Sequence, residues 1–429
     1  MFDRKKSVPL TLPHLAHLPR SADVLLVVLC AVLAVPGVAS SATPPAGGNP
    51  RCSDATAAAC PSLLGDGCLL CAGQHYAELQ HAGCNASTIE YACHHVSPAS
   101  ALAWLEQLSD WIVGLDIASD TLAESGGRTC SPCSTTEDRS HIFVNGNLAR
   151  VLLATWRLQE GTAGRAGNQT LLDAGLSWLD SLCDQQAAIQ TSKGNAGGFW
   201  GAGYPVVGPR GSIYFGDTGT AVTALALGWH LSGNQTQKAR FLETMERFAA
   251  FVLEGSSTPP PGKNGTCDGF VSPASSGVNA GAVGCGYYAH RPSTLPYTIA
   301  TGTTGAAFFS ELYSITRKSH YAAIVNGSID YLARVTLPSG EIPYILDGHN
   351  STSVNPDRSV GVWPLDTIAY CTEGIAAAGL HFPGMARGVA VQFKSTVDYL
   401  LQTQGDDGYW GRPASGDLER SPRVPFPLN

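Results

Sequence analysis

The amino-acid sequence predicts an all-α fold, an (α/α)5–6 toroid of helical hairpins with a small N-terminal disulfide-rich module. The first observation is the stretch 215–253, where apolar residues recur at three- and four-residue steps on both sides of Gly233-Asn234, a helix-stop signal. The second is that similar helix pairs recur within residues 97–411. The third is that long loops separate the pairs, which places these loops at one end of the bundle.

The composition is that of a globular, acidic chain. Its 429 residues are 44% hydrophobic and only 14% charged, and the formal net charge is −8. A nucleic-acid-binding protein needs a basic surface, which this balance does not supply. We therefore expect no nucleic-acid partner.

Residues 1–42 have the organisation of a secretory signal peptide. Basic residues precede an apolar run at 24–35, and small residues follow at 37–42. The apolar run is shorter than the ~20 residues of a bilayer span. We therefore expect cleavage near 39–42, a secreted or secretory-pathway protein, and no stable membrane span afterwards. The alternative is an uncleaved signal anchor, which would make a type II membrane protein.

Residues 43–96 form the second unit, a cysteine-rich module. Six of the thirteen cysteines are in it: Cys52, Cys60, Cys68, Cys71, Cys84 and Cys93. Without Cys30 of the signal, twelve cysteines remain, an even number that suits disulfide pairing. An oxidising compartment favours bridges, which we expect to close within this module. Zinc is the alternative, because Cys68 and Cys71 have ligand spacing.

Other features agree with export. Asn-x-Ser/Thr sequons, the acceptors of N-linked glycans, occur at Asn85, Asn168, Asn234, Asn264, Asn326 and Asn350. Beyond the module we expect two local bridges, Cys130–Cys133 and Cys267–Cys285. Cys183 and Cys371 fall on predicted helices, where they are either buried thiols or a pair.

The helical domain is predicted to cover residues 97–429. Proline in the first turn of a helix is favourable, so Ser97-Pro98 predicts a helix that runs to about residue 119. Four hairpins follow, whose first helices are expected from Asn147, Asp217, Thr301 and Asp366, and whose second helices end near Trp178, Phe248, Tyr331 and Tyr399. A loop with glycine and an aromatic residue follows each second helix.

The repeat of the hairpins predicts how they assemble. A single hairpin cannot bury its apolar face alone, so the hairpins must pack on one another. The first helices are rich in Gly, Ala and Thr and can pack closely around an axis, with the bulkier second helices outside. Long loops at 188–216, 255–296 and 337–364 each lead into a first helix. They are expected to wall a cleft over the N-terminal ends of these helices.

Short motifs in the repeat resemble those of the six-hairpin glycosidase superfamily and the related terpenoid-cyclase and prenyltransferase toroids. They are Gly-Phe-Trp-Gly at 198–201, Gly-Tyr-Trp-Gly at 408–411, Asp-Thr-Gly-Thr at 217–220 and Asp-Thr-Ile-Ala at 366–369. The resemblance implies catalytic carboxylates at the mouth of the toroid. The Asp-x-Asp-Asp motif of the cyclases and the zinc sets of prenyltransferases and lanthionine cyclases are not evident, so we expect no cofactor and no metal.

Three carboxylates are candidate catalytic residues: Glu373, Asp366 and Asp217. Glycoside cleavage needs a carboxyl pair, one to protonate the leaving oxygen and one to activate water or attack. Glu373 is in a small, apolar helix, two turns after Asp366 on the same face, and burial there would suit a general acid. Asp366 and Asp217 would then be the base or nucleophile. The alternative for both aspartates is that they only cap their helices.

Aromatic residues near these carboxylates are candidate substrate-binding residues, because an aromatic ring stacks well on the apolar face of a sugar. The candidates are Trp200, Tyr204, Tyr214, Tyr297, Trp363 and Tyr370. The alternative is that part of the loop aromatics plug the ends of the toroid.

Two classes of function remain. The first is a secreted, monomeric, carbohydrate-active enzyme, a glycoside hydrolase-like protein for which a lyase or an epimerase is a variant. The second is a non-catalytic toroid that binds a glycan or a protein at the cell surface. Two carboxyls ~5–10 Å apart across an open cleft would support hydrolysis, whereas a plugged or carboxyl-free mouth would support binding.

Overall fold

The structure is a computed structural model that describes residues 50–60, 71–86, 88–89, 98–114, 142–161, 165–199, 212–288, 291–345 and 364–403. Of the described residues 69% are helical, and the strands are few and short, which confirms the predicted predominance of helix. None of the helices in these ranges combines the length and apolar character that a membrane crossing requires.

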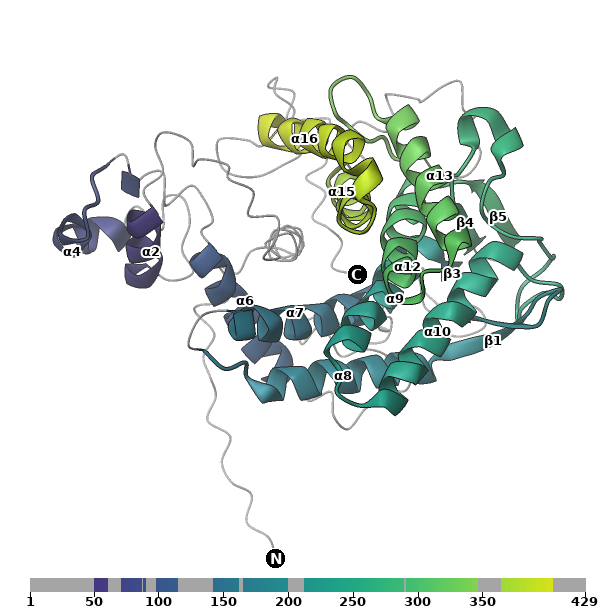
Figure 1. The fold of residues 1–429 in the computed structure, drawn as a ribbon, viewed down its shortest axis with the longest axis horizontal. Helices are drawn as coiled ribbons and strands as arrows, with labels where there is room; N and C mark the ends of the chain where they lie inside the picture. The colour runs from purple at the N-terminus through teal and green to yellow at the C-terminus, as the bar shows by residue number, and fades with distance from the viewer. Residues whose placement is uncertain are drawn as a thin grey trace, which may run out of the picture.

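The described part of the chain contains four helical hairpins. They are α7 (Ile142–Gly161) with α8 (Gln169–Asp184), α9 (Phe215–Leu231) with α10 (Gln235–Glu254), the run α11 (Thr298–Ala300), η3 (Thr301–Phe308) and α12 (Phe309–Thr316) with α13 (Ser319–Val335), and α15 (Pro364–His381) with α16 (Ala386–Thr403). The one-turn helix η4 (Pro383–Met385) joins the last two. The first helices follow one another along an arc, with their partners on its outer side (Figure 1). The hairpins were therefore predicted correctly, and the described helices form this arc.

Small residues bring the inner helices of the arc together. A Cβ atom on Gly146 would overlap the backbone of Ala221, so α7 and α9 are in backbone contact there. A Cβ on Gly219 would lie 2.7 Å from the amide nitrogen of Thr304, and one on Gly302 would lie 2.7 Å from Cα of Cys371. These contacts connect α7 to α9, α9 to η3 and η3 to α15. The predicted close packing of the first helices through small residues is confirmed for these neighbouring pairs.

The outer helices cover the arc with large apolar side chains. Phe241, Met245, Phe248 and Val252 of α10 are completely buried, on the face that the sequence periodicity predicts. The ring of Phe248 packs edge to face against Phe215 of α9, with centroids 5.6 Å apart. Burial of one such phenylalanine side chain stabilises the fold by about 1.5–3 kcal/mol, so these contacts hold α10 against the inner helices.

Short turns at one end of the hairpins begin the outer helices. Asn168 caps α8 and Asn234 caps α10. The side chain of each asparagine accepts hydrogen bonds from backbone N–H groups in the first turn of its helix. At the third hairpin Arg317 takes a left-handed conformation, with φ 57°, and ends α12. At the opposite end the long loops lead from each outer helix to the next inner one.

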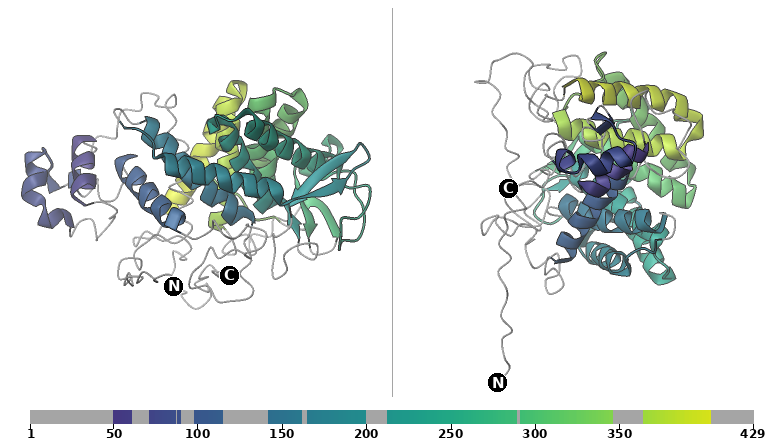
Figure 2. Two further views of the ribbon diagram at one scale, coloured as in Figure 1. Left: turned by 90° about the horizontal axis from the view of Figure 1, so that it is seen from below. Right: turned by 90° about the vertical axis from the view of Figure 1, so that its left-hand side faces the viewer.

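The strands of the structure lie in the long loops. β1 (Gln186–Gln190) pairs antiparallel with β2 (Asn195–Phe199), and β4 (Gly284–Tyr288) lies between β3 (Ile213–Tyr214) and β5 (Arg291–Pro296). A short 3-10 helix, η2 (Ala274–Asn279), precedes β4. The strands gather beyond one end of the helices (Figure 2). Strands were predicted only in loops, as observed.

The N-terminal module has a small core of its own. It consists of α2 (Pro50–Ala59), α4 (Tyr76–His81) and the turns around them, beside α6 (Pro98–Gly114) at the left of Figure 1. Disulfides join Cys52 to Cys84 and Cys60 to Cys71. Both bridges close within the module, as predicted, and Cys71 is not available to the alternative zinc site. Cys68 and Cys93 lie outside the described residues.

The predicted bridge between Cys267 and Cys285 is wrong, because no disulfide joins them. The thiol of Cys267 is surrounded instead by hydrogen-bonding groups of Ser256 and Tyr287. Cys183 and Cys371 are separate buried thiols, and burial raises the pKa of Cys183 to about 11. The predicted bridge Cys130–Cys133 lies outside the described residues.

Candidate functional site

Tyrosines gather where the inner helices begin. Tyr214 precedes α9 and Tyr297 precedes α11, and the hydroxyl of Tyr214 donates a hydrogen bond to that of Tyr297. Their ring centroids are 5.2 Å apart, and the ring of Tyr344 meets Tyr297 edge to face at 5.7 Å. Tyr297 is only 1% exposed, whereas Tyr214 is partly exposed. Tyr214 and Tyr297, two of the predicted binding residues, are thus brought together, and of these two only Tyr214 is partly exposed.

Asp217 lies in the first turn of α9, beside these tyrosines. The helix begins at Phe215, two residues earlier than predicted, and its N-cap is Tyr214, so Asp217 is not the cap residue. The side chain is partly buried. Burial is the first cause that raises the pKa of Tyr214, and the charge of Asp217 is one of the smaller ones. A carboxylate in this first turn is also favoured by the positive end of the helix dipole.

The glycine contacts show how deep Asp217 lies relative to the other candidates. Gly219 of α9 contacts Thr304 of η3, and these two segments are parallel. Two residues earlier along both segments, Asp217 is therefore level with Gly302. Gly302 in turn meets Cys371 of α15, two residues before Glu373. Asp217 and Glu373 therefore lie at about the same depth in the bundle, on α9 and α15.

Glu373 is buried and forms an ion pair with Arg150. The guanidinium Nη2 of Arg150 donates to Oε1 of Glu373, and the two residues are 6% and 8% exposed. Arg150 comes from α7 and Glu373 from α15, the first and the last inner helix of the arc (Figure 1). The pair thus joins the two ends of the arc. Within this pair the carboxyl group of Glu373 faces the positive charge of the Arg150 guanidinium.

The remaining predicted residues have different outcomes. Asp366 is the third residue of α15, two turns before Glu373, and its side chain is not among those described. Tyr370 lies between these two carboxyl residues on the same helix and is partly buried. Trp200, Tyr204 and Trp363 lie outside the described residues.

Buried hydroxyl groups without a hydrogen-bond partner lie next to each candidate carboxylate. Among the described residues they include Thr218, which follows Asp217, Thr367, which follows Asp366, and Thr372, which precedes Glu373. All three threonines are at most 1% exposed. A buried polar atom without a hydrogen-bond partner is costly. Buried polar atoms without a partner also occur elsewhere in the described residues, for example in Trp156, Ser310 and Thr396, so these atoms do not by themselves single out the N-terminal halves of α9 and α15.

A second polar group lies at the short-turn end, and the sequence did not point to it. His381 of α15 and Glu311 of α12 form a hydrogen bond of 3.0 Å. Burial acts to raise the pKa of Glu311, but the hydrogen bond to His381 and the nearby charges of His230 and Arg150 outweigh it and lower the pKa. Burial lowers the pKa of His230. The described residues contain no group of three His, Cys, Asp or Glu arranged to hold a metal ion.

The replacement Glu311→Gln is expected to remove part of the acid sensitivity of the fold. Because the pKa of Glu311 is below its ordinary value of 4.5 in the folded chain, the ionised group stabilises the fold above that pH. This stabilisation is lost as the pH falls through the folded-state pKa. Urea unfolding should therefore separate wild type from variant at neutral pH and bring them together well below pH 4.5. A separation that is the same at both pH values would contradict the prediction.

Arg150 was missed although a signal for it exists. It interrupts the apolar stretch Leu148–Ala154 of α7, as Glu373 interrupts that of α15. A charge on a helix that is otherwise apolar needs a partner or a function. Applying this rule to both helices would have suggested the pair.

Comparison with known proteins adds no family to this geometry. No protein-family model matches the chain, and no curated protein has a significant sequence match to it.

Proposed function

We propose that this chain is a secreted carbohydrate-active enzyme of the glycoside hydrolase type, built on a closed α/α toroid whose mouth is the long-loop end. The observation that carries the proposal is the buried carboxylate of Glu373, paired with Arg150 at the depth of Asp217. A buried ion pair costs desolvation and is weak evidence for stability alone. The ion pair has a function if Arg150 holds a catalytic carboxylate, that of Glu373, in a fixed position.

The pairing changes the roles that the sequence suggested. An ion-paired Glu373 suits the base or the nucleophile, because both must begin the reaction as a carboxylate. The role of general acid is then left to Asp217 or Asp366, each of which is the third residue of its own inner helix. Asp217 is partly buried and lies beside Tyr214, which places its carboxyl group next to an aromatic residue at this end of the bundle.

Binding of a sugar chain has support of its own at this end. Tyr214 and Tyr370 are partly exposed aromatic residues near the carboxylates. The carboxyl residue Asp217, which is also partly exposed, lies beside Tyr214. Aromatic rings with a few convergent polar groups are the usual make-up of a small-molecule site.

A non-catalytic glycan- or protein-binding toroid is the second candidate. The observation that favours it is the closure of the tyrosine cluster, since Tyr297 is 1% exposed and accepts the hydrogen bond of Tyr214. Rings packed on one another present few faces to a sugar. In that case the pair of Arg150 and Glu373 only holds the ends of the arc together.

The replacement Glu373→Gln separates the two candidates. Gln retains the shape and an oxygen that can accept from Arg150, but it cannot carry the charge or the proton. On a panel of polysaccharides and oligosaccharides, assayed by release of reducing ends, wild type should show turnover, and the variant should lose it by about 10²-fold or more. Analysis of the products distinguishes hydrolysis from elimination and from epimerisation.

The matched control is Glu341→Gln. Glu341 is also buried, at 5% exposed, but follows α13 and is hydrogen-bonded to Tyr399. This variant should keep its turnover, and circular dichroism should show both variants folded. Equal turnover in Glu373→Gln and wild type would remove Glu373 from the mechanism. Glycan binding without turnover in the wild type would support the second candidate.

A further inference from the structure

Two glycosylation sequons lie in the short turns of neighbouring hairpins. Asn168-Gln169-Thr170 starts α8, and Asn234-Gln235-Thr236 starts α10. All six residues are exposed. Both sites are therefore open to solvent in the folded chain, as a bulky modification requires.

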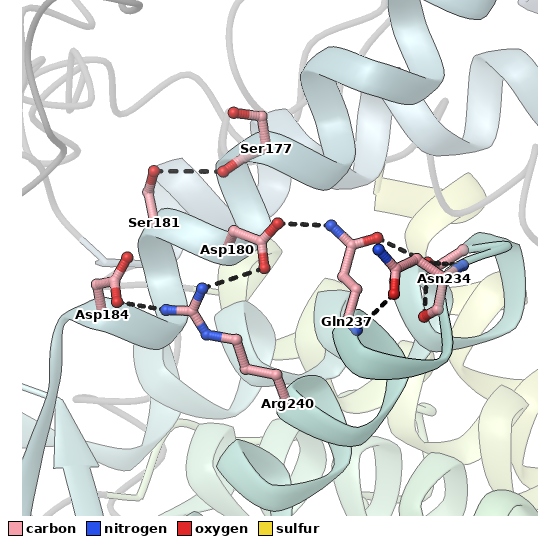
Figure 3. Close-up of polar contacts among 8 residues, drawn as sticks. Ser177, Asp180, Ser181, Asp184, Asn234, Gln237 and Arg240 are labelled. Atoms are coloured by element: carbon pink, nitrogen blue, oxygen red, sulfur yellow. Dashed lines mark hydrogen bonds and ion pairs between the residues drawn. The ribbon is translucent and has the colours of Figure 1, made fainter.

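Each asparagine uses one end of its amide for the fold. Oδ1 of Asn168 accepts from the backbone amide of Thr170 at 3.0 Å. Oδ1 of Asn234 accepts from the amide of Thr236 at 2.9 Å. It also accepts from the amide of Gln237 at 3.3 Å (Figure 3). In the described part of the chain, Nδ2 of neither asparagine donates a hydrogen bond. Serine, threonine or aspartate would cap about as well, so the cap explains the oxygen and leaves the nitrogen without a role.

We propose that Asn168 and Asn234 are glycosylated, each carrying an N-linked oligosaccharide on Nδ2. The donor is an oligosaccharide on a lipid pyrophosphate. A bond forms between Nδ2 and the anomeric carbon, the bond from that carbon to the pyrophosphate oxygen breaks, and one amide proton passes to a base of the transferase. Oδ1 keeps its lone pairs, so both caps persist after the modification.

The two glycans would lie close together. α8 and α10 are adjacent, because Arg240 of α10 pairs with Asp180 and Asp184 of α8, and Asp180 also accepts from Gln237 (Figure 3). Both asparagines are at the short-turn end, opposite the long loops. The oligosaccharides would therefore cover the short-turn end of the first two hairpins. This inference needs only passage through a secretory compartment, which the disulfides of the N-terminal module fit, and is independent of any catalysis.

The sequon at Asn326 differs and is not part of the proposal. It lies inside α13, and the hydroxyl of its Ser328 is completely buried, donating to the carbonyl of Gly281 at 3.1 Å. The folded chain thus uses this serine for packing, whereas Thr170 and Thr236 remain exposed.

The test uses the full chain made in a eukaryotic secretory host. Removal of N-glycans by an amidase in heavy-oxygen water converts each glycosylated asparagine to labelled aspartate, which peptide mass spectrometry reads directly. We expect the label at Asn168 and Asn234. Unmodified asparagine at both positions, in protein from the medium or from the cells, overturns the proposal without the need for any variant.

Matched variants separate the glycan from the cap. Thr170→Ala and Thr236→Ala destroy the sequons but retain the capping asparagines, so each should remove one mobility step on a gel. After enzymatic deglycosylation, their melting temperatures should match that of deglycosylated wild type. Asn168→Ala and Asn234→Ala should remove the same steps and also lower the melting temperature, because the cap is lost. Mobility that does not change in the threonine variants contradicts the proposal.

Discussion

Arg150→Met is expected to lower the free energy of unfolding by about 3–5 kcal/mol, which is the cost of leaving a buried charge without its partner. Arg150 and Glu373 are 6% and 8% exposed, so water cannot replace the guanidinium. Methionine fills much of the volume of the arginine stem, so the loss of the charge dominates the effect. Chemical denaturation of wild type and variant at neutral pH gives the difference in their free energies of unfolding. The dependence of this free energy on denaturant concentration is compared between the two proteins.

Two controls show whether the cost comes from the buried charge. The double variant Arg150→Met/Glu373→Leu removes both charges and should recover most of the stability, as the replacement of buried ion pairs by apolar residues often does. Lys394→Met breaks the exposed pair with Asp398 within α16 and should change the free energy by about 0–1 kcal/mol. A cost for Arg150→Met no larger than that for Lys394→Met would show that the pair contributes little.

The sequence predicted the features that depend on local periodicity. The inward face of α10, the short turns at Asn168 and Asn234, and the four described hairpins all follow from apolar spacing and capping residues. The helix starts were less accurate. α9 begins before Asp217 because Phe215 is buried against Phe270, with ring centroids 4.7 Å apart, and this tertiary contact has no local signal.

The candidate site depends on contacts between distant parts of the chain, which local patterns do not encode. Arg150 and Glu373 are 223 positions apart, and their pairing follows only once the arc is built. The same holds for Glu311 and His381, which meet where two hairpins end. The cysteine prediction failed for a related reason, because Cys267 and Cys285 are close in sequence but Tyr287 and Ser256 surround the first of them. Glu373 itself was found because a charge in an apolar helix is a local anomaly.

Close packing of η3 and α15 leads to the second prediction with a large effect. Gly374→Ala should lower the free energy of unfolding by about 3 kcal/mol, at the upper end of the usual range for overpacking. A Cβ atom on Gly374 would overlap the carbonyl oxygen of Gly302 and lie 2.7 Å from Cβ of Ala306. The obstacle includes backbone, which cannot rotate away as a side chain can, so α15 must move from η3.

The matched variant is Gly388→Ala in α16, which also replaces a glycine within a helix by alanine. A Cβ there meets nothing within 4 Å, so only helix propensity changes, and alanine should stabilise the helix by about 0.5–1 kcal/mol. The same chemical change should therefore have opposite signs at the two positions. Movement of α15 would also carry Glu373 away from Arg150, so Gly374→Ala should weaken any activity that depends on this carboxylate. Equal effects at Gly374 and Gly388 in thermal unfolding would rule out the close contact of the inner helices.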